Sequence, residues 1–381
     1  MNPPLHGVTV IDLTRVLAGP YCSMVLLDLG ARVIKVEVPP RGDDSRNIGP
    51  FIDGRSAYFM SLNRGKESIA LDLKDAAGRE IFERLLDRAD VLLENFRAGT
   101  MESLGYGWPL LHERWPRLIY AATSGFGQQG PYSHRPAYDM VVQAMGGIMS
   151  LTGHPGGLPT RVGTSIGDIT AGLFTAIGIN AALYGREQTG EGVMIDVAML
   201  DAQVAILENA IARYAATGEV PGPIGSRHPS ITPFEAYATA DGYIVITAGN
   251  NPQFRRLCEL LGDPAIAEDA RFANNNTRTE HHAALKERFE AQLAKRSSAE
   301  WLAMLDAEGI PSGPLQDVAQ VLADPQVQSR NMVVTAPGPS GPLTMAGNPI
   351  KFADVDDPST RGAAPELDEH RESILRWLDG S

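Results

Sequence analysis

Short apolar runs alternate with helical patterns through the first third of the chain, and this alternation allows only a few architectures. The runs, each expected to form a strand, are Val8–Leu13, Val33–Val38, Ile69–Leu73, Val91–Phe96 and Leu118–Ser124. A helical pattern follows the first run, and Ala76–Arg88 is amphipathic. Parallel strands need long crossover connections, usually helices. The pattern therefore predicts an α/β fold, with a Rossmann-like parallel sheet that helices cover on both faces.

The composition changes after residue 214. Residues 215–233 are dense in Gly and Pro, which favours a linker. Residues 234–325 begin with a hairpin-like pair around Asp241 and continue as amphipathic helices, so we expect a smaller α+β domain there. Residues 326–381 return to turns and short strands and end in a helix. The chain therefore divides into a large N-terminal part, a linker, a small domain and a closing segment.

The net charge of −13 and the presence of only two cysteines narrow the functions open to the chain. An acidic protein repels nucleic acid and anionic membranes, so neither is expected as a partner. Cys22 and Cys258 lie in apolar helical patterns without a CxxC motif or a His cluster, which predicts buried thiols and no metal site. The N-terminus lacks a signal-peptide pattern, and no run reaches the ~18 apolar residues of a membrane span. We therefore expect a cytoplasmic protein.

Asp168 is the candidate catalytic residue. It lies in Ser165–Gly172, where glycines flank it. The next segment, Leu173–Tyr184, is predicted to be an apolar, buried helix. The chain has no P-loop, strand-borne GxGxxG, HExxH or serine nucleophile elbow, and Gly163–Gly167 (GTSIG) is only superficially similar to GxSxG. An Asp before a helix commonly caps the helix, and this structural role stays open. The alternative is a carboxylate nucleophile, which small neighbours would expose to a bulky substrate and to backbone N–H groups.

Polar and basic residues gather where the predicted strands end. Lys66 and Lys74 flank one strand, Asn95-Phe96-Arg97 ends another, and a glycine-rich turn follows Ser124. Taken singly, the lysines are typical of a solvated face and the turn is typical of an ordinary loop. Because the carboxyl ends of strands in open α/β sheets gather ligand groups, the residues together suit an elongated, phosphorylated ligand.

Segments along nearly the whole chain resemble, in order and spacing, the class III CoA-transferases of the formyl-CoA:oxalate and carnitine type. The matching segments are Leu5–Glu37, Leu62–Lys74, Asp90–Gly105, Pro116–Tyr132, Ala137–Gly153, Gly167–Gly172, Arg186–Asp201 and Gly309–Val318. The resemblance implies transfer of CoA from an acyl-CoA thioester to a free carboxylic acid, with no permanently bound cofactor. It also implies an interlocked homodimer, whose large CoA-binding domain is built from both chain ends, residues 1–214 and 326–381.

The same resemblance assigns roles to individual residues. Asp168 matches the family's catalytic aspartate, whose carboxylate attacks the thioester. The residues that match the family's CoA contacts are Leu71, Asp72, Leu73, Lys74, Asn95, Phe96 and Arg97. Leu17, Ala18 and Tyr138 match positions beside the acyl group.

The chain departs from the family's pattern at several positions. Val38 and Ser103 replace basic residues that contact CoA in some members, so we expect Arg46 to supply part of the phosphate clamp. The glycine-rich loop of oxalate-using members is replaced by a short stretch near residues 248–251, which disfavours oxalate as the acceptor. Arg227–Tyr237 is more similar to members acting on succinate, mesaconate, itaconate or citramalate, which implies a dicarboxylic acid.

Two other functions stay open. The α-methylacyl-CoA racemases share the fold but need a second acid or base opposite the aspartate, because the proton leaves one face and returns to the other. They place a His where this chain has Tyr138, and a phenol with a pKa near ~10 suits that role poorly. A protein that binds CoA without catalysis is the other alternative, which the glycine setting of Asp168 disfavours.

Overall fold

The computed structural model describes residues 1–380, which form two compact units. The large unit contains Met1–Ser150, Arg161–Pro221 and the described chain from Pro325 onward. The small unit contains Leu151–Thr160 and Gly222–Asp324. Each unit encloses hydrophobic core residues of its own.

The large unit is built on a six-stranded sheet in which every pair of neighbouring strands is parallel. In the order β5-β2-β1-β6-β7-β8, the strands are Glu67–Ala70, Arg32–Glu37, Thr9–Asp12, Val91–Glu94, Ile119–Ser124 and Met194–Ala198. The predicted α/β fold with a parallel sheet is confirmed. The edge strand β8 is an addition to the predicted strands.

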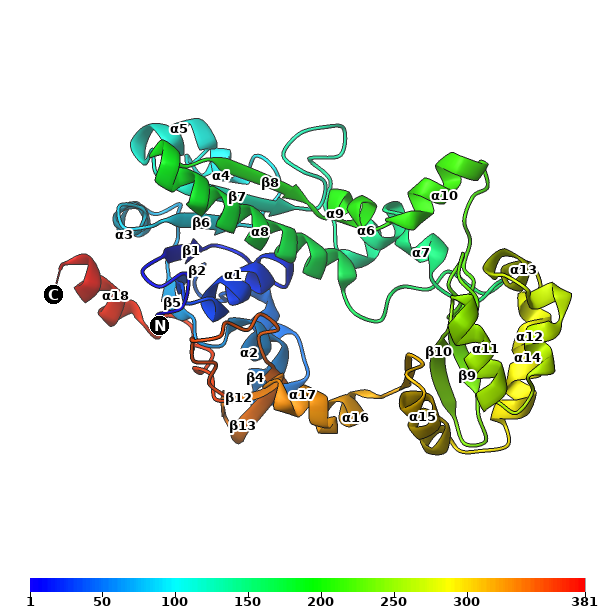
Figure 1. Cartoon of the computed structure of the whole chain (residues 1–381). Helices are drawn as coiled ribbons and strands as arrows, with labels where there is room; N and C mark the ends of the chain where they lie inside the picture. Colours follow the sequence, from blue (N-terminus) through cyan, green and yellow to red (C-terminus); the bar gives the residue numbers. More distant parts are fainter. Residues whose placement is uncertain (381) are drawn as a thin grey trace. The chain divides into compact units, whose positions relative to one another are not determined.

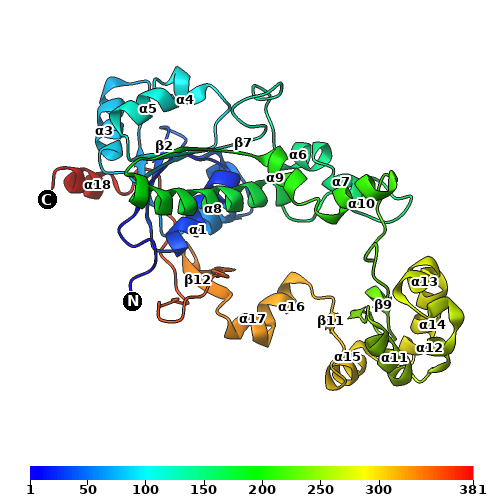
Figure 2. The same ribbon diagram turned by 45° about the horizontal axis from the view of Figure 1, so that its top comes forward.

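Side chains of the sheet alternate between two hydrophobic cores, because successive residues of a strand point to opposite faces. Ile11 of β1 lies in the core formed with α3, α4, α5 and α18, whereas Val10 lies in the core formed with α1 and α8. In Figures 1 and 2, α3, α4 and α5 lie on one face of the sheet, and α1 and α8 lie on the opposite face. The helices span Ala76–Leu86 (α3), Thr100–Ser103 (α4), Trp108–Arg114 (α5), Arg371–Leu378 (α18), Ala18–Asp28 (α1) and Ile166–Thr189 (α8).

Helices α1 and α8 approach each other closely at Gly172. A Cβ atom at this position would lie 2.5 Å from the Ala18 carbonyl oxygen, so a residue without a side chain is required. Helix α8 begins at Ile166, whereas the sequence predicts a helix that begins only at Leu173. Glycine and polar residues disfavour a helix in this first stretch, but packing against α1 stabilises it.

By length and composition, α8 could cross a membrane, contrary to the expectation that no segment is apolar enough. Its residues Ala176, Ile179 and Leu183 are buried in the core that α8 shares with α1 and the sheet. A core helix meets the same criterion, because it too is apolar around much of its circumference.

The remaining parts of the large unit flank the sheet. They comprise η1 (Asp44–Asn47), β3 (Phe51–Ile52), β4 (Arg55–Ser56), α2 (Ala57–Asn63), α6 (Asp139–Met145), α9 (Met199–Ala205), α10 (Asn209–Thr217), α17 (Pro325–Ser329), β12 (Val333–Gly338) and β13 (Gly341–Ala346), while α7 (Ile148–Leu151) ends at the boundary with the small unit. Val334 and Met345 of the β12–β13 hairpin share a core with Phe59 and Met60 of α2. The closing segment of the chain therefore packs within the large unit.

The small unit has a three-stranded antiparallel sheet in the order β11-β10-β9. The strands are Ser312–Pro314, Tyr243–Thr247 and Phe234–Ala238, and the helices are α11 (Asn251–Leu260), α12 (Ala265–Glu268), η2 (Ala270–Phe272), α13 (Asn275–Glu280), α14 (His282–Leu293), α15 (Ser298–Ala307) and α16 (Val318–Ala323). The hairpin predicted around Asp241 is formed by β9 and β10. Ile244, Phe254 and Phe289 belong to the core between this sheet and its helices.

Candidate active site

The strand order of the large sheet reverses at β1, so the loops that leave β1 and β6 diverge. In open parallel sheets such a switch point forms a crevice at the carboxyl ends of the strands, where ligands bind. Asn95, directly after β6, joins the two loops. Its Oδ1 accepts a hydrogen bond from the Arg15 N–H at 2.8 Å, and its Nδ2 donates to the Arg15 carbonyl oxygen at 2.7 Å. The Asn95 side chain therefore fixes the backbone at the crevice.

A cavity of about 170 Å³, which we call the aspartate cavity, opens at this crevice. The predicted site residues that line it are Leu17, Ala18, Asn95, Phe96, Arg97, Tyr138 and Asp168. They come from loops and helices at the ends of several strands, and the fold brings them together although they are up to 151 positions apart (168 − 17) in the sequence. Tyr138 is 73% exposed, so its ring lies at the mouth rather than in the interior.

Asp168 is the third residue of α8, because the helix begins at Ile166 and Ser165 holds the N-cap position. The Gly167 N–H, which α8 itself leaves without an acceptor, donates to Asp139 Oδ1 at 2.8 Å. The interpretation of Asp168 as the helix cap is therefore wrong. Asp139 satisfies the neighbouring donor, and the Asp168 side chain lines the cavity.

Burial raises the pKa of Asp168 to about 7, and the negative charge of Asp139 adds to the increase. The nearby Ala18 N–H acts in the opposite direction, because it stabilises the ionised Asp168 carboxylate. Ala18 is the first residue of α1, so its N–H points out of the helix. A carboxylate with a raised pKa is more basic than an exposed one, which suits it to act as a nucleophile once it is ionised.

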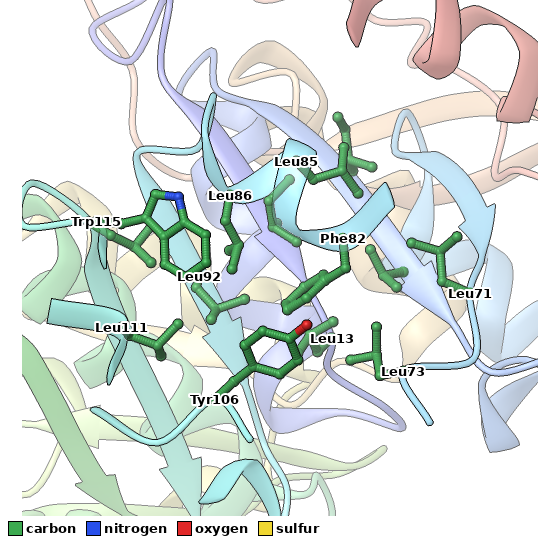
Figure 3. Packing of buried hydrophobic residues seen from close by; sticks show 14 of the residues in the cluster. Leu13, Leu71, Leu73, Phe82, Leu85, Leu86, Leu92, Tyr106, Leu111 and Trp115 are labelled. Carbon is green, nitrogen blue, oxygen red and sulfur yellow. The ribbon is translucent and has the colours of Figure 1, made fainter. Parts of the chain in front are cut away.

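A second cavity of about 380 Å³, which we call the strand-end cavity, lies at the carboxyl ends of β2 and β5. The predicted residues Leu71, Asp72, Leu73, Lys74 and Phe96 line it. Leu71 and Leu73 are buried and continue into the hydrophobic core beside Leu13 and Phe82 (Figure 3). Arg15 and Phe96 line both cavities, so the two cavities adjoin.

The structure places Arg46 against Glu37. Its Nε and Nη2 donate to the two carboxylate oxygens of Glu37 at 2.8 and 2.7 Å, and its guanidinium carbon lies 3.8 Å from the centre of the Phe59 ring. Arg46 is not among the residues that line either cavity. This pairing disfavours the predicted role of Arg46 in a phosphate clamp.

Lys66 lies neither on a solvated face nor along either cavity. It is fully buried, and its Nζ lies 3.2 Å from a carboxylate oxygen of Asp12, which is also fully buried. Lys66 Nζ also donates to Ser23 Oγ at 2.8 Å. The residue therefore belongs to the interior of the large unit.

Two arginines that are not predicted from the sequence also lie at the site. Arg15 lines both cavities, and its guanidinium carbon lies 5.6 Å from the centre of the Phe96 ring. Arg135 lines the aspartate cavity. The rule that selects Asn95-Phe96-Arg97 could have found Arg15, since it follows the end of β1. No regular pattern marks the loop that carries Arg135.

Within residues 1–380, no group of three or more His, Cys, Asp and Glu side chains is arranged to hold a metal ion. The two cavities combine apolar leucines, several cations and one carboxylate of raised pKa. This arrangement can bind an elongated anionic ligand and hold a nucleophilic carboxylate against one end of it.

The chain is similar to known proteins over nearly its whole length. A family model described as CoA-transferase family III matches residues 5–371. The chain is 49% identical over 374 residues to the acetyl-CoA:oxalate CoA-transferase of Acetobacter aceti, which covers 98% of this chain and 95% of that protein. It is 40% identical over 393 residues to the succinate–glutarate CoA-transferase of Agrobacterium fabrum, covering 99% and 96%. A CAIB/BAIF family protein from Brucella suis, of known crystal structure, is 41% identical and matches with a TM-score of 0.87 over 100% of both chains.

Proposed function

The chain belongs to CoA-transferase family III, and we propose that it moves CoA from an acyl-CoA to a dicarboxylic acid through a covalent intermediate on Asp168. One observation carries this proposal. The Asp168 carboxylate has a raised pKa, lines a cavity at the switch point of the sheet and lies near the N–H of Ala18, the first residue of α1. A dicarboxylic acceptor is proposed from the names of the two relatives, which act on oxalate and glutarate.

The proposed reaction proceeds through two adducts of Asp168. The carboxylate attacks the thioester carbonyl carbon, the C–S bond breaks, and CoA leaves as a thiolate from a mixed anhydride. The thiolate attacks the Asp168 carbonyl carbon, so the first acid leaves as its carboxylate and an aspartyl-CoA thioester remains. The incoming carboxylate then attacks this thioester, and the same steps run in reverse. The Ala18 N–H is placed to stabilise negative charge on the oxygens of these adducts.

CoA would lie along both cavities, because Arg15 and Phe96 line each of them. Lys74 and Arg97 supply further cations for the phosphate groups, one in each cavity. Leu71 and Leu73 line the strand-end cavity, so the uncharged parts of CoA would lie beside them. Arg15 thus takes the place that the sequence analysis gives to Arg46.

An exchange assay tests the proposed function. Purified protein is incubated with acetyl-, succinyl- or formyl-CoA and labelled oxalate, succinate, glutarate or mesaconate. We expect label to enter the CoA thioester of at least one dicarboxylate without net hydrolysis, because the intermediate partitions to an acid rather than to water. Oxalate belongs in the panel despite the missing glycine-rich loop, since one relative is named for it. Hydrolysis without exchange would contradict the proposal.

The rate should depend on pH through Asp168. Because the pKa is raised to about 7 and the ionised form is the nucleophile, kcat/KM should fall about tenfold for each pH unit below 7. Asp139→Asn removes the like charge and should move this acid limb to lower pH, while burial keeps it above the ordinary value of an aspartate. A pH profile of each protein measures the shift. Identical acid limbs would show that Asp139 does not act on Asp168.

A homodimer is proposed as the functional assembly. Helix α8 presents an apolar face in the single chain: Leu173, Phe174, Ile177 and Tyr184 are exposed, the last two by 62% and 73%. Such a face at helical spacing is typical of a partner interface. Sedimentation analysis should give twice the mass of the chain, and Ile177→Glu should shift the protein toward monomer. A stable wild-type monomer would contradict the proposal.

The racemase alternative has less support. A racemase needs a second acid or base facing Asp168, and no histidine is among the described residues that line the aspartate cavity.

The cytoplasmic location stays a prediction.

A further inference from the structure

The turn between β1 and α1 contains a residue in an uncommon conformation. Val16 has a φ of +65°, in the left-handed region that β-branched residues rarely adopt. It lines the aspartate cavity together with Leu17 and Ala18. A strained residue persists only where its surroundings hold it in place.

Asp43 holds this turn. Its Oδ1 accepts a hydrogen bond from the Val16 N–H at 3.0 Å, and the same oxygen accepts from the Ser45 N–H at 2.8 Å and the Ser45 hydroxyl at 2.7 Å. Its Oδ2 lies 2.8 Å from Lys35 Nζ, and both side chains are fully buried. Lys35 Nζ also donates to the Thr14 carbonyl oxygen at 2.7 Å. The ion pair therefore binds the turn on both sides of Arg15.

The two oxygens of Asp43 have different tasks, and both need the ionised side chain. Burial alone would raise the pKa of Asp43, but the positive charge of Lys35 and the hydrogen-bond donors outweigh burial and hold this pKa well below its ordinary value. An amide has only one acceptor oxygen. An asparagine at this position would therefore turn its NH₂ group either toward the Lys35 ammonium or toward the Val16 N–H.

We propose that Asp43 is a positioning residue for CoA transfer: through Val16 and Lys35 it holds the turn that presents the Ala18 N–H to Asp168. Asp43 does not have to touch the substrate for this role, although the strand-end cavity reaches it. The proposal rests on the proposed function, because the Ala18 N–H matters only if Asp168 carries the reaction. Its physical basis is preorganisation, since a donor placed before the reaction need not be reoriented during it.

Asp43→Asn in the full-length protein tests the proposal. We expect kcat for exchange to fall by about 10²-fold, as a displacement of about 1 Å can cause, while the KM for acyl-CoA changes much less. The matched control is Asp28→Asn, which breaks another buried ion pair: Asp28 accepts from Arg64 Nη1 and Nη2 at 2.7 Å, with side chains 6% and 1% exposed. Asp28 lies at the far end of α1, so its loss should lower the melting temperature but leave kcat nearly unchanged.

Val16→Gly separates positioning from general stability. Glycine adopts a left-handed conformation without strain, so the turn should depend less on Asp43 when residue 16 is glycine. Asp43→Asn should then lower kcat by a smaller factor in the Val16→Gly background than in the wild-type background. Ser45→Ala is a milder substitution that removes one hydrogen bond to Asp43 Oδ1. It is made in the wild-type and Val16→Gly backgrounds in the same way, and its two loss factors test the positioning role if Asp43→Asn does not fold.

The outcomes distinguish the two proposals. Equal loss factors in both backgrounds, or a kcat for Asp43→Asn no lower than that for Asp28→Asn, would overturn the positioning role while leaving the proposed function intact. A wild-type protein that exchanges no acid would overturn the proposed function itself.

Discussion

Asp168→Asn should lower the rate of CoA exchange by about 10⁴-fold or more, because an amide cannot act as the anionic nucleophile. The substitution preserves the size of the side chain and keeps an oxygen that can face the Ala18 N–H. The loss would therefore reflect the missing nucleophile rather than a change in packing. Transfer of label from a free acid into its CoA thioester measures the rate.

The Asp168 variant should still bind CoA. The proposed contacts with Lys74, Arg15 and Phe96 come from other elements, and they do not depend on the carboxylate. Calorimetric titration with CoA should give a dissociation constant close to that of the wild type. Exchange by the variant at a rate near the wild-type rate would show that another group carries the reaction.

Gly172→Ala should lower both the stability of the protein and its kcat. The added Cβ would lie 2.5 Å from the Ala18 carbonyl oxygen and 3.3 Å from the Cys22 nitrogen, so α1 and α8 would have to separate. Overpacking of this kind costs about 1–3 kcal/mol of stability. Because Asp168 lies on one helix and the Ala18 N–H on the other, we expect kcat to fall about 10²-fold as well.

Gly185→Ala is the matched control on the same helix. No described atom outside the local backbone lies within 4 Å of the Cβ that this substitution adds. Alanine favours a helix over glycine by about 1 kcal/mol, so this variant should be at least as stable as the wild type and keep its kcat. Thermal unfolding and exchange assays compare the two variants. Equal behaviour would mean that the contact at Gly172 does not position the site.

The parallel sheet could be predicted from the sequence because its signal is local. Apolar runs such as Val91–Phe96 supply side chains to both faces of the sheet, and the helices between them have a different period. The edge strand β8 (MIDVA) could not be found in this way, because Asp196 interrupts its short apolar pattern. Its place is set by pairing with β7.

The candidate site could be predicted only in part. Strand-end position, together with the resemblance, selected residues such as Lys74, Asn95 and Phe96, which do line the two cavities. The roles of other residues depend on contacts between segments that are distant in the sequence. Arg46 pairs with Glu37, and Asp139 rather than Asp168 accepts from the N-terminus of α8. Neither pairing leaves a periodic signal in the sequence.

The central claim is that Asp168 forms a covalent adduct with the substrate, and chemical trapping tests it most directly. The protein is incubated with acyl-CoA, treated with hydroxylamine and digested with trypsin, and the peptide spanning residues 162–186 is analysed by mass spectrometry. The mechanism predicts an aspartyl hydroxamate at Asp168 that forms only when acyl-CoA is present. An unmodified Asp168 in protein that is actively exchanging acids, or an adduct at a different residue, would contradict it.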